Sequence, residues 1–326
     1  MLLKNFKYNR EDTSNVMIEL DPSLKNLLIE TISGNMPSDQ IEALGQMLIP
    51  SFSIYELSGK GKNFTIAPKT AAELLVNIMI EKKHLESFIK LLVELDEETI
   101  GGKEIHIQGL EYFLQNLANI GYIYDPVKRK VIPLKKDIKQ SPSWGVLKNK
   151  RTYHFAVLSI DIVGSSELVR EFGREKMEKF YAFFGSVMRE RLTAYDGRIW
   201  SWAGDGGIVA FTFKQPELNA VQFSIEMQRI VLLVNTNARN PISRDVAIRI
   251  GVNAGDIVFL MDTGRMVSDV INLAAHLEKG GANPGMISIT GKVWKELPSK
   301  MQDVFSPEDD FEGQSHYRTP ARLDQF

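Results

Sequence analysis

Two kinds of hydrophobic pattern divide the chain. In its first third, apolar residues recur at helical spacing, as Leu85, Phe88 and Leu92 do. This spacing gathers apolar side chains on one face and predicts a series of amphipathic helices. One of these helices is expected to begin with a capping box formed by Thr70 and Glu73. In the second half, short apolar runs bounded by Gly and Asp alternate with helical stretches, which predicts buried strands connected by helices.

The second half is expected to form an α+β sheet. Strands are predicted over His154–Ile160, Arg198–Ala203, Ile208–Phe213, Val246–Val252, Ile257–Met261 and Met286–Thr290, with helices over 177–188, 217–234 and 270–279. The order β-α-β-β-α-β is typical of a ferredoxin-like sheet with helices on one face. We therefore expect a mostly helical domain over residues 1–140, a basic linker over 141–151 that contains Ser, Pro and Gly, and an α+β domain over 152–326.

Composition narrows the class of protein. Of the 326 residues, 44% are hydrophobic and 25% are charged, as in ordinary globular proteins. The formal charge of -2 provides no basic excess for binding nucleic acid. Cysteine is absent, which excludes disulfides, cysteine metal sites and thiol nucleophiles. The charged start does not fit a secretory signal, and no apolar run reaches the ~18 residues of a membrane span. A cytoplasmic protein without membrane or nucleic-acid partners is expected.

The first candidate site lies where the first strand of the second half ends. Asp161 follows that apolar run, and Ile162-Val163-Gly164-Ser165-Ser166 comes next. Gly164 lets the backbone approach a ligand, while the N–H groups of Ser165 and Ser166 would open a helix that can bind phosphate. The simpler interpretation is that Asp161 only caps this helix.

A second acidic residue lies in the next hairpin. Asp205 is in the turn Gly204-Asp205-Gly206-Gly207, where an acidic residue can simply be a turn former. In a ferredoxin-like sheet this hairpin neighbours the first strand, so Asp161 and Asp205 are expected to converge. Two carboxylates beside a phosphate-binding turn are what a pair of Mg²⁺ or Mn²⁺ ions requires.

A third segment places polar residues on a helix. Asp269 is expected at the start of this helix, with Asn272 and His276 at i, i+4 on one face. Taken alone, the segment is compatible with Asp269 as an N-cap and two ordinary helical side chains.

These three segments occur in a familiar order. The stretches FAVLSIDIVGSSELV, GRIWSWAGDGGIVAF, RIGVNAGDI and SDVINLAAHLE resemble the class III nucleotide cyclase catalytic domain over roughly residues 151–320. The resemblance implies that Asp161, Asp205 and the Ile162 carbonyl hold two Mg²⁺ or Mn²⁺ ions. It also implies that residues 164–166 cradle the triphosphate and that Asn272 orients the ribose.

The resemblance further implies a reaction and an assembly. The 3′-hydroxyl of a nucleoside triphosphate would attack its α-phosphate, release pyrophosphate and form a 3′,5′-cyclic nucleotide. Class III cyclases build each site across a head-to-tail homodimer, so the carboxylates Asp161 and Asp205 would face Asn272 of the other subunit.

The sequence departs from this family at the base-reading position. The usual lysine is replaced by Ser201, while the acidic partner is kept as Asp269. A short hydroxyl with one carboxylate suits a pyrimidine, and Trp200 or Trp202 could fill the space of a purine or simply pack on the sheet. The domain therefore resembles bacterial cyclases that make cyclic UMP or CMP in antiphage signalling. The alternative is an adenylate or guanylate cyclase with atypical base contacts.

A second departure is His276, which stands where the family has a transition-state arginine. His276 could supply a hydrogen bond or a charge, or Arg265 could substitute for it. With Ser201, this departure leaves open an inactive regulatory pseudo-cyclase. The helical first half weakly resembles death-like effector-associated modules and is expected to be a regulatory or docking domain.

Overall fold

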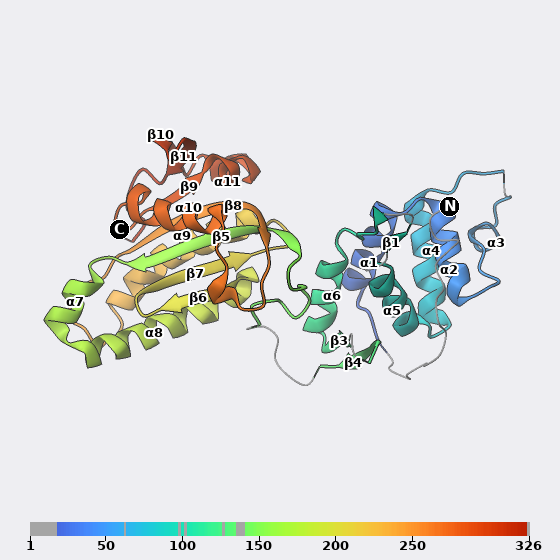
Figure 1. Ribbon diagram of the computed structural model, residues 1–326, viewed down its shortest axis with the longest axis horizontal. Coiled ribbons are helices and arrows are strands. Elements are labelled where there is room, and N and C mark those ends of the chain that lie inside the picture. Colours follow the sequence, from blue (N-terminus) through green and yellow to red (C-terminus); the bar gives the residue numbers. More distant parts are fainter. Residues whose placement is uncertain are drawn as a thin grey trace. The chain divides into compact units, whose positions relative to one another are not determined.

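The computed structural model describes residues 18–61, 63–96, 99–100, 103–125, 128–134 and 141–324. The chain divides into two compact units, residues 1–138 and 139–326. Each unit has an apolar core of its own and is described by itself (Figure 1).

The first unit is mostly helical, as the sequence predicts. Its helices are α1 (Pro22–Asn35), α2 (Ser38–Leu48), α3 (Ile54–Ser58), α4 (Pro68–Glu81), α5 (Leu85–Leu95) and α6 (Leu110–Asn119). Two short antiparallel pairs accompany them, β1 (Thr99–Ile100) with β2 (Lys103–Glu104) and β3 (Tyr122–Asp125) with β4 (Lys130–Pro133). The helices share one core, in which Leu28, Ile32, Leu75 and Phe88 are fully buried.

The predicted capping box of α4 is wrong. The helix begins at Pro68, and no side chain caps it. Proline at the first helical position has its φ preset for a helix and has no N–H that needs a partner. Thr70 and Glu73 therefore lie inside the helix rather than at its start.

The second unit contains the expected α+β fold. Its strands are β5 (Thr152–Ile162), β6 (Arg198–Ala203), β7 (Gly206–Phe211), β8 (Ile248–Val258), β9 (Ile287–Thr290), β10 (Ser306–Phe311) and β11 (Gln314–Arg318). Its α-helices are α7 (Ser165–Phe172), α8 (Arg174–Leu192), α9 (Pro216–Asn235), α10 (Asp269–His276), α11 (Gly291–Glu296) and α12 (Ser299–Gln302). Short 3₁₀ segments η2 (Thr193–Tyr195) and η3 (Thr263–Arg265) and the π-helix η4 (Leu277–Gly281) complete it.

The strands form one sheet in the order β10-β11-β9-β8-β5-β7-β6. Strand β5 is central and pairs antiparallel with both β7 and β8, while β8 and β9 are parallel. The elements β5, α8, β6, β7, α9 and β8 reproduce the predicted β-α-β-β-α-β order. The two strands predicted over Val246–Val252 and Ile257–Met261 are wrong as separate elements, because β8 runs without a break along β5.

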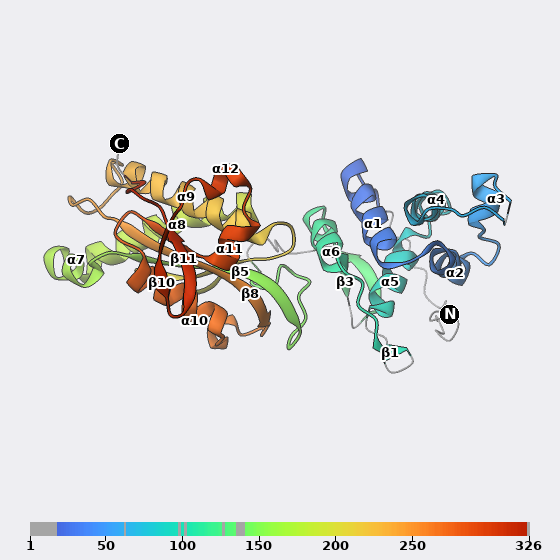
Figure 2. The ribbon, with the colours of Figure 1, turned by 90° about the horizontal axis from the view of Figure 1, so that it is seen from above.

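Helices cover both faces of this sheet, so the expectation of helices on one face is corrected. Alternate residues of β5 point to opposite faces. Leu158 and Ile160 pack with residues of α8 and α9. Phe155 and Val157 face the other way and pack with Ala274 of α10. Figure 2 shows α9 and α10 on opposite sides of the strands. The second layer arises because β5 is apolar on both of its faces.

The segment predicted as a linker takes part in this second layer. Trp144 is fully buried, and its Nε1 donates a hydrogen bond to the Asp196 carbonyl at 2.8 Å. Its ring lies 6.1 Å from that of Phe155. Residues 141–147 are therefore part of the packing of the second unit.

Candidate functional site

The acidic residue of the first candidate segment lies at the end of the central strand. Asp161 is the penultimate residue of β5 and is paired in register with Gly206 of β7 on one side and Arg249 of β8 on the other. Its position after the apolar run His154–Ile160 agrees with the sequence prediction. Because neighbours in register point to the same face, Arg249 lies beside the Asp161 side chain.

The hairpin between β6 and β7 brings the second carboxylate to the same place. The Ile162 N–H donates to the Asp205 carbonyl at 3.1 Å, and the Ser165 hydroxyl donates to the Asp205 carboxylate. A Cβ on Gly206 would lie 2.4 Å from the Ile160 carbonyl oxygen and 3.1 Å from Asp161 Oδ1, so only glycine permits this approach.

Burial and mutual repulsion mark Asp161 and Asp205 as a pair. The pKa of Asp161 is raised, first by burial and also by the neighbouring Asp205 carboxylate, against the opposing effect of Arg249. Burial first, and then the same two carboxylates, raises the pKa of Tyr181 on α8, whose ring lies against Gly204. A cation placed beside Asp161 would favour its ionised form.

The turn after β5 leads directly into helix α7. Gly164 has φ of 69° and is the N-cap of α7, a conformation that favours glycine. Ser165 and Ser166 are the first two residues of that helix. Their N–H groups therefore belong to the unsatisfied first turn, next to the carboxylate that Ser165 contacts.

Two residues of the site, Arg249 and Glu278, were not predicted from the sequence. Arg249 Nη2 lies 2.9 Å from Asp161 Oδ2, and Arg249 Nε lies 3.1 Å from Glu278 Oε1. Glu278 is 8% exposed, and burial first, then Asp161, raises its pKa to about 7. A Cβ on Gly251 would lie 2.3 Å from the Glu278 nitrogen, so this glycine allows η4 to rest on β8. Arg249 is the first residue of the RIGVNAGDI stretch. A charged residue inside an otherwise apolar strand was the feature of the sequence that could have pointed to this site residue.

The third predicted segment forms α10, but Ser268 is its N-cap and accepts a hydrogen bond from the Ile271 N–H. Asp269 is therefore the first helical residue, and the N-cap interpretation is wrong. Asp269, Asn272 and His276 are all exposed on this helix. Within residues 141–324, no hydrogen bond or ion pair joins Asn272 or His276 to the Asp161–Asp205 pair.

His276 has a partner of its own. Its Nδ1 lies 2.8 Å from Oε1 of Glu312, in the turn between β10 and β11, and both side chains are more than half exposed. Arg265, the other candidate for the family's arginine, is an exposed residue of η3 and pairs with Asp262 at 3.1 Å.

Ser201, the residue predicted to read the base, lies between two packed tryptophans. Ser201 is exposed on β6. Trp200 is 5% exposed and lies edge-on against Phe155 at 4.7 Å, so it belongs to the core and fills no base pocket. Trp202 is half-buried, packs against the α8 side of the sheet, and donates from Nε1 to the Gly204 carbonyl.

A search of the described residues for membrane-spanning helices found none with the required length and apolarity.

The second half of the chain is similar to known proteins. The family model described as adenylate and guanylate cyclase catalytic domain matches residues 147–319. A protein named "Putative adenylate cyclase 3" from Rhizobium meliloti (strain 1021) is 29% identical over 135 residues, which are 41% of this chain and 22% of that protein. The match thus spans less than a quarter of that relative's length.

Solved cyclase structures are also similar. The adenylyl cyclase CyaB from P. aeruginosa is 24% identical, with 54% of this chain and 98% of that chain covered and a TM-score of 0.45. The guanylyl cyclase domain of the RhoGC fusion protein from the aquatic fungus Blastocladiella emersonii is 16% identical, with coverage of 54% and 99% and a TM-score of 0.46. Because the family model covers more than half of the sequence, this chain belongs to the adenylate and guanylate cyclase catalytic domain family.

Proposed function

We propose that the chain is a nucleotide cyclase that converts a pyrimidine nucleoside triphosphate, UTP or CTP, to its 3′,5′-cyclic nucleotide and pyrophosphate. The observation that carries this proposal is the meeting of Asp161 and Asp205 beside the turn at residues 164–166, in a domain of the cyclase family.

The residues at this place fit divalent metal ions. Asp161 and Asp205 offer hard oxygen donors, with the Ile162 carbonyl as a third candidate, and Mg²⁺ and Mn²⁺ prefer such ligands. Burial first, and the Asp205 carboxylate as well, raises the pKa of Asp161, and a bound cation would oppose both effects. Two bound ions would favour ionisation of the 3′-hydroxyl and offset the charge of the phosphates.

The chain's own residues would position the substrate. The N–H groups of Ser165 and Ser166 would bind the triphosphate, and the Arg249 guanidinium, 2.9 Å from Asp161, lies within the same site and suits phosphate. A bond would form between the 3′-oxygen and the α-phosphorus. At the same time the bond between the α-phosphorus and the oxygen that bridges it to the β-phosphate would break. The 3′-hydroxyl proton is released to solvent and pyrophosphate leaves.

The active assembly we propose is a head-to-tail homodimer with composite sites. Asn272 and His276 are exposed and have no polar contact with the Asp161–Asp205 pair in one chain, so a second subunit would have to supply them. Three large apolar residues between the end of β8 and the start of α10 also remain exposed, which supports a partner surface near this segment. They are Val258, Met261 and Val267, at 52%, 58% and 82% exposure.

Base choice is attributed to Ser201 and Asp269. Asp269 could accept the N3–H of uracil or the N4 amine of cytosine, and Ser201 lacks the reach of a lysine to a purine edge. Both side chains are exposed in one chain, so the partner subunit would have to cover them. An unmatched donor or acceptor buried in that way costs about 1–3 kcal/mol, which corresponds to roughly 10–100-fold in selectivity. Since Trp200 is in the core, exclusion of purines depends on these polar contacts and not on that ring.

The test is turnover of ATP, GTP, CTP and UTP by the full chain in Mg²⁺ or Mn²⁺, with products separated by chromatography. Cyclic UMP or cyclic CMP as the main product supports the proposal. Robust cyclic AMP or cyclic GMP without a pyrimidine product would instead favour a purine cyclase with atypical contacts. Nucleotide binding without any product would favour a pseudo-cyclase.

The first unit is proposed as a regulatory or docking module of a cytoplasmic antiphage signalling protein. It has a core of its own, and we identified no catalytic constellation in its described residues. Expression in bacteria challenged with phage, with an Asp161→Ala chain as control, tests this role. Equal plaque numbers with both chains would contradict it.

A further inference from the structure

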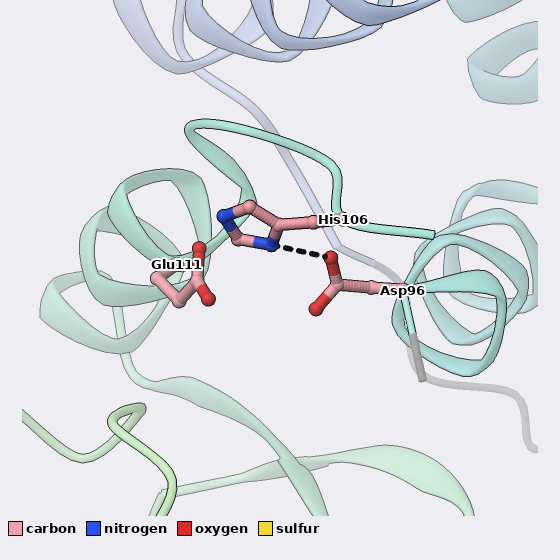
Figure 3. Close-up of side chains that lie close together, drawn as sticks. All are labelled: Asp96, His106 and Glu111. Atoms are coloured by element: carbon pink, nitrogen blue, oxygen red, sulfur yellow. Dashed lines mark hydrogen bonds and ion pairs between the residues drawn. The ribbon is translucent and has the colours of Figure 1, made fainter. Parts of the chain in front are cut away.

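The first unit contains a group of metal-ligating side chains that the proposed cyclase reaction does not use. Asp96, His106 and Glu111 each offer one ligand atom, and these atoms all lie within 4.8 Å of one another. Figure 3 shows the His106 ring between the two carboxylates, with Asp96 and Glu111 pointing toward it. The three residues come from the end of α5, the segment before α6 and the first turn of α6.

Both carboxylates of the group are buried in the first unit. Asp96 is 1% exposed and Glu111 is 6% exposed. Ionised carboxylates removed from water cost several kcal/mol each unless a cation or hydrogen bonds offset the loss. The His106 side chain is 51% exposed and its Nδ1 lies 3.2 Å from Asp96 Oδ1, so it lies at the edge of the group where an ion could enter.

Asp96 is held in place by the backbone. The Ile107 N–H donates to Asp96 Oδ1 at 2.7 Å, in a buried position next to His106. Contacts of this kind orient a ligand and are typical of the shell around a metal site. The polar group therefore joins the end of α5 to the start of α6.

We propose that Asp96, His106 and Glu111 bind a divalent transition-metal ion of the zinc class. One imidazole nitrogen and two carboxylate oxygens suit Zn²⁺ better than Mg²⁺ or Ca²⁺, which prefer oxygen ligands alone. Three protein ligands leave a fourth position for water. The site is separate from the cyclase carboxylates and does not depend on the proposed reaction, and the ion would fasten α5 to α6.

The competing source of positive charge is Lys90. It lies on α5, six residues before Asp96, and is 8% exposed. If Lys90 supplies the compensating charge, the group needs no metal ion and chelation leaves the first unit unchanged.

The experiment is a Zn²⁺ titration of the chelator-treated full chain by calorimetry, in an Asp161→Asn background that removes binding at the cyclase carboxylates. We expect one saturable Zn²⁺ per chain. His106→Gln should weaken its affinity at least about tenfold, because one of three ligands is lost. The matched control is His84→Gln, a histidine of the same unit outside the group, which should leave the affinity unchanged.

A second readout follows the fold rather than the titration. Zn²⁺ should raise the unfolding temperature of the first unit in scanning calorimetry for the parent and for His84→Gln, but not for His106→Gln. Because the His106 side chain is half exposed, that variant is expected to retain its circular dichroism spectrum. Absence of saturable Zn²⁺ binding, or equal affinity in the parent and His106→Gln, would overturn the proposal.

Discussion

Replacing Glu278 by glutamine is expected to stabilise the second unit above neutral pH. Glu278 lies in η4, is 8% exposed, and has Oε1 3.1 Å from Arg249 Nε. Arg249 also pairs with Asp161, so one guanidinium serves two carboxylates. Glutamine keeps the shape of the side chain and removes the charge that is costly to bury.

The magnitude follows from the pKa of the Glu278 carboxyl, which is raised from 4.5 to about 7, first by burial and then by Asp161. A folded-state pKa above the unfolded one gives stability that is fully present below the unfolded pKa and is lost as pH rises through the folded pKa. The shift corresponds to about 3 kcal/mol, most of it lost between roughly pH 5 and pH 8.5. Glu278→Gln has no such loss.

The assay is urea unfolding followed by tryptophan fluorescence, in chelator, across that pH range. All four tryptophans, Trp144, Trp200, Trp202 and Trp294, lie in the second unit, so their fluorescence reports on it alone. The difference in free energy of unfolding, Glu278→Gln minus parent, should increase by about 2–3 kcal/mol as pH rises from 5 to 8.5.

The matched control is Glu308→Gln, which removes the same charge from the more exposed Glu308–Arg318 pair. A difference in unfolding free energy between Glu278→Gln and the parent that is the same at every pH would refute the reasoning, because it would reflect only a changed contact with Arg249.

Three further outcomes are expected. The hydrogen bond to Glu217 raises the pKa of His154. The protonated His154 therefore stabilises the fold fully below about pH 6.5, and this stabilisation is lost at higher pH. In urea unfolding, His154→Gln should destabilise the second unit at pH 5.5 more than at pH 9. His276→Ala should lower kcat by roughly tenfold or more with little change in unfolding temperature, and unchanged kinetics would remove His276 from the site. Gly206→Ala should destabilise the fold by about 1–3 kcal/mol in the same unfolding assay, because its Cβ would lie 2.4 Å from the Ile160 carbonyl oxygen.

The order of strands and helices in the second unit was predictable because it depends on local pattern. The run before Asp161 and the glycine-rich turn around Asp205 are both short-range signals, and both segments fold as expected. Once β5 and β7 pair, these two carboxylates must come together. Their meeting was therefore the part of the candidate site that a sequence pattern could establish.

Other features depend on contacts that the local pattern does not record. The register of β6 shifts between Ile199 and Ser201, so alternation along that strand could not show that Trp200 points into the core. Arg249 and Glu278 are distant in sequence and meet only because Gly251 lets η4 approach β8. Such close approaches are visible in coordinates and not in periodicity.

The start of α10 shows a further limit. Ser268 and Asp269 are adjacent, and both residue types are good N-caps. The sequence pattern favoured Asp269, whereas the serine hydroxyl accepts the hydrogen bond from the Ile271 N–H. The shift by one residue leaves Asp269 in the first turn of the helix, where a carboxylate is also favoured by the helix dipole.

The most direct test of the central claim is product formation by the full chain and by Asp161→Ala, with all four nucleoside triphosphates in Mn²⁺. The account predicts a cyclic nucleotide from the parent chain and a loss of about 10³-fold or more in the variant, with the tryptophan fluorescence of a folded second unit retained. Equal product from a folded Asp161→Ala chain would contradict the claim that Asp161 and Asp205 form the catalytic metal site.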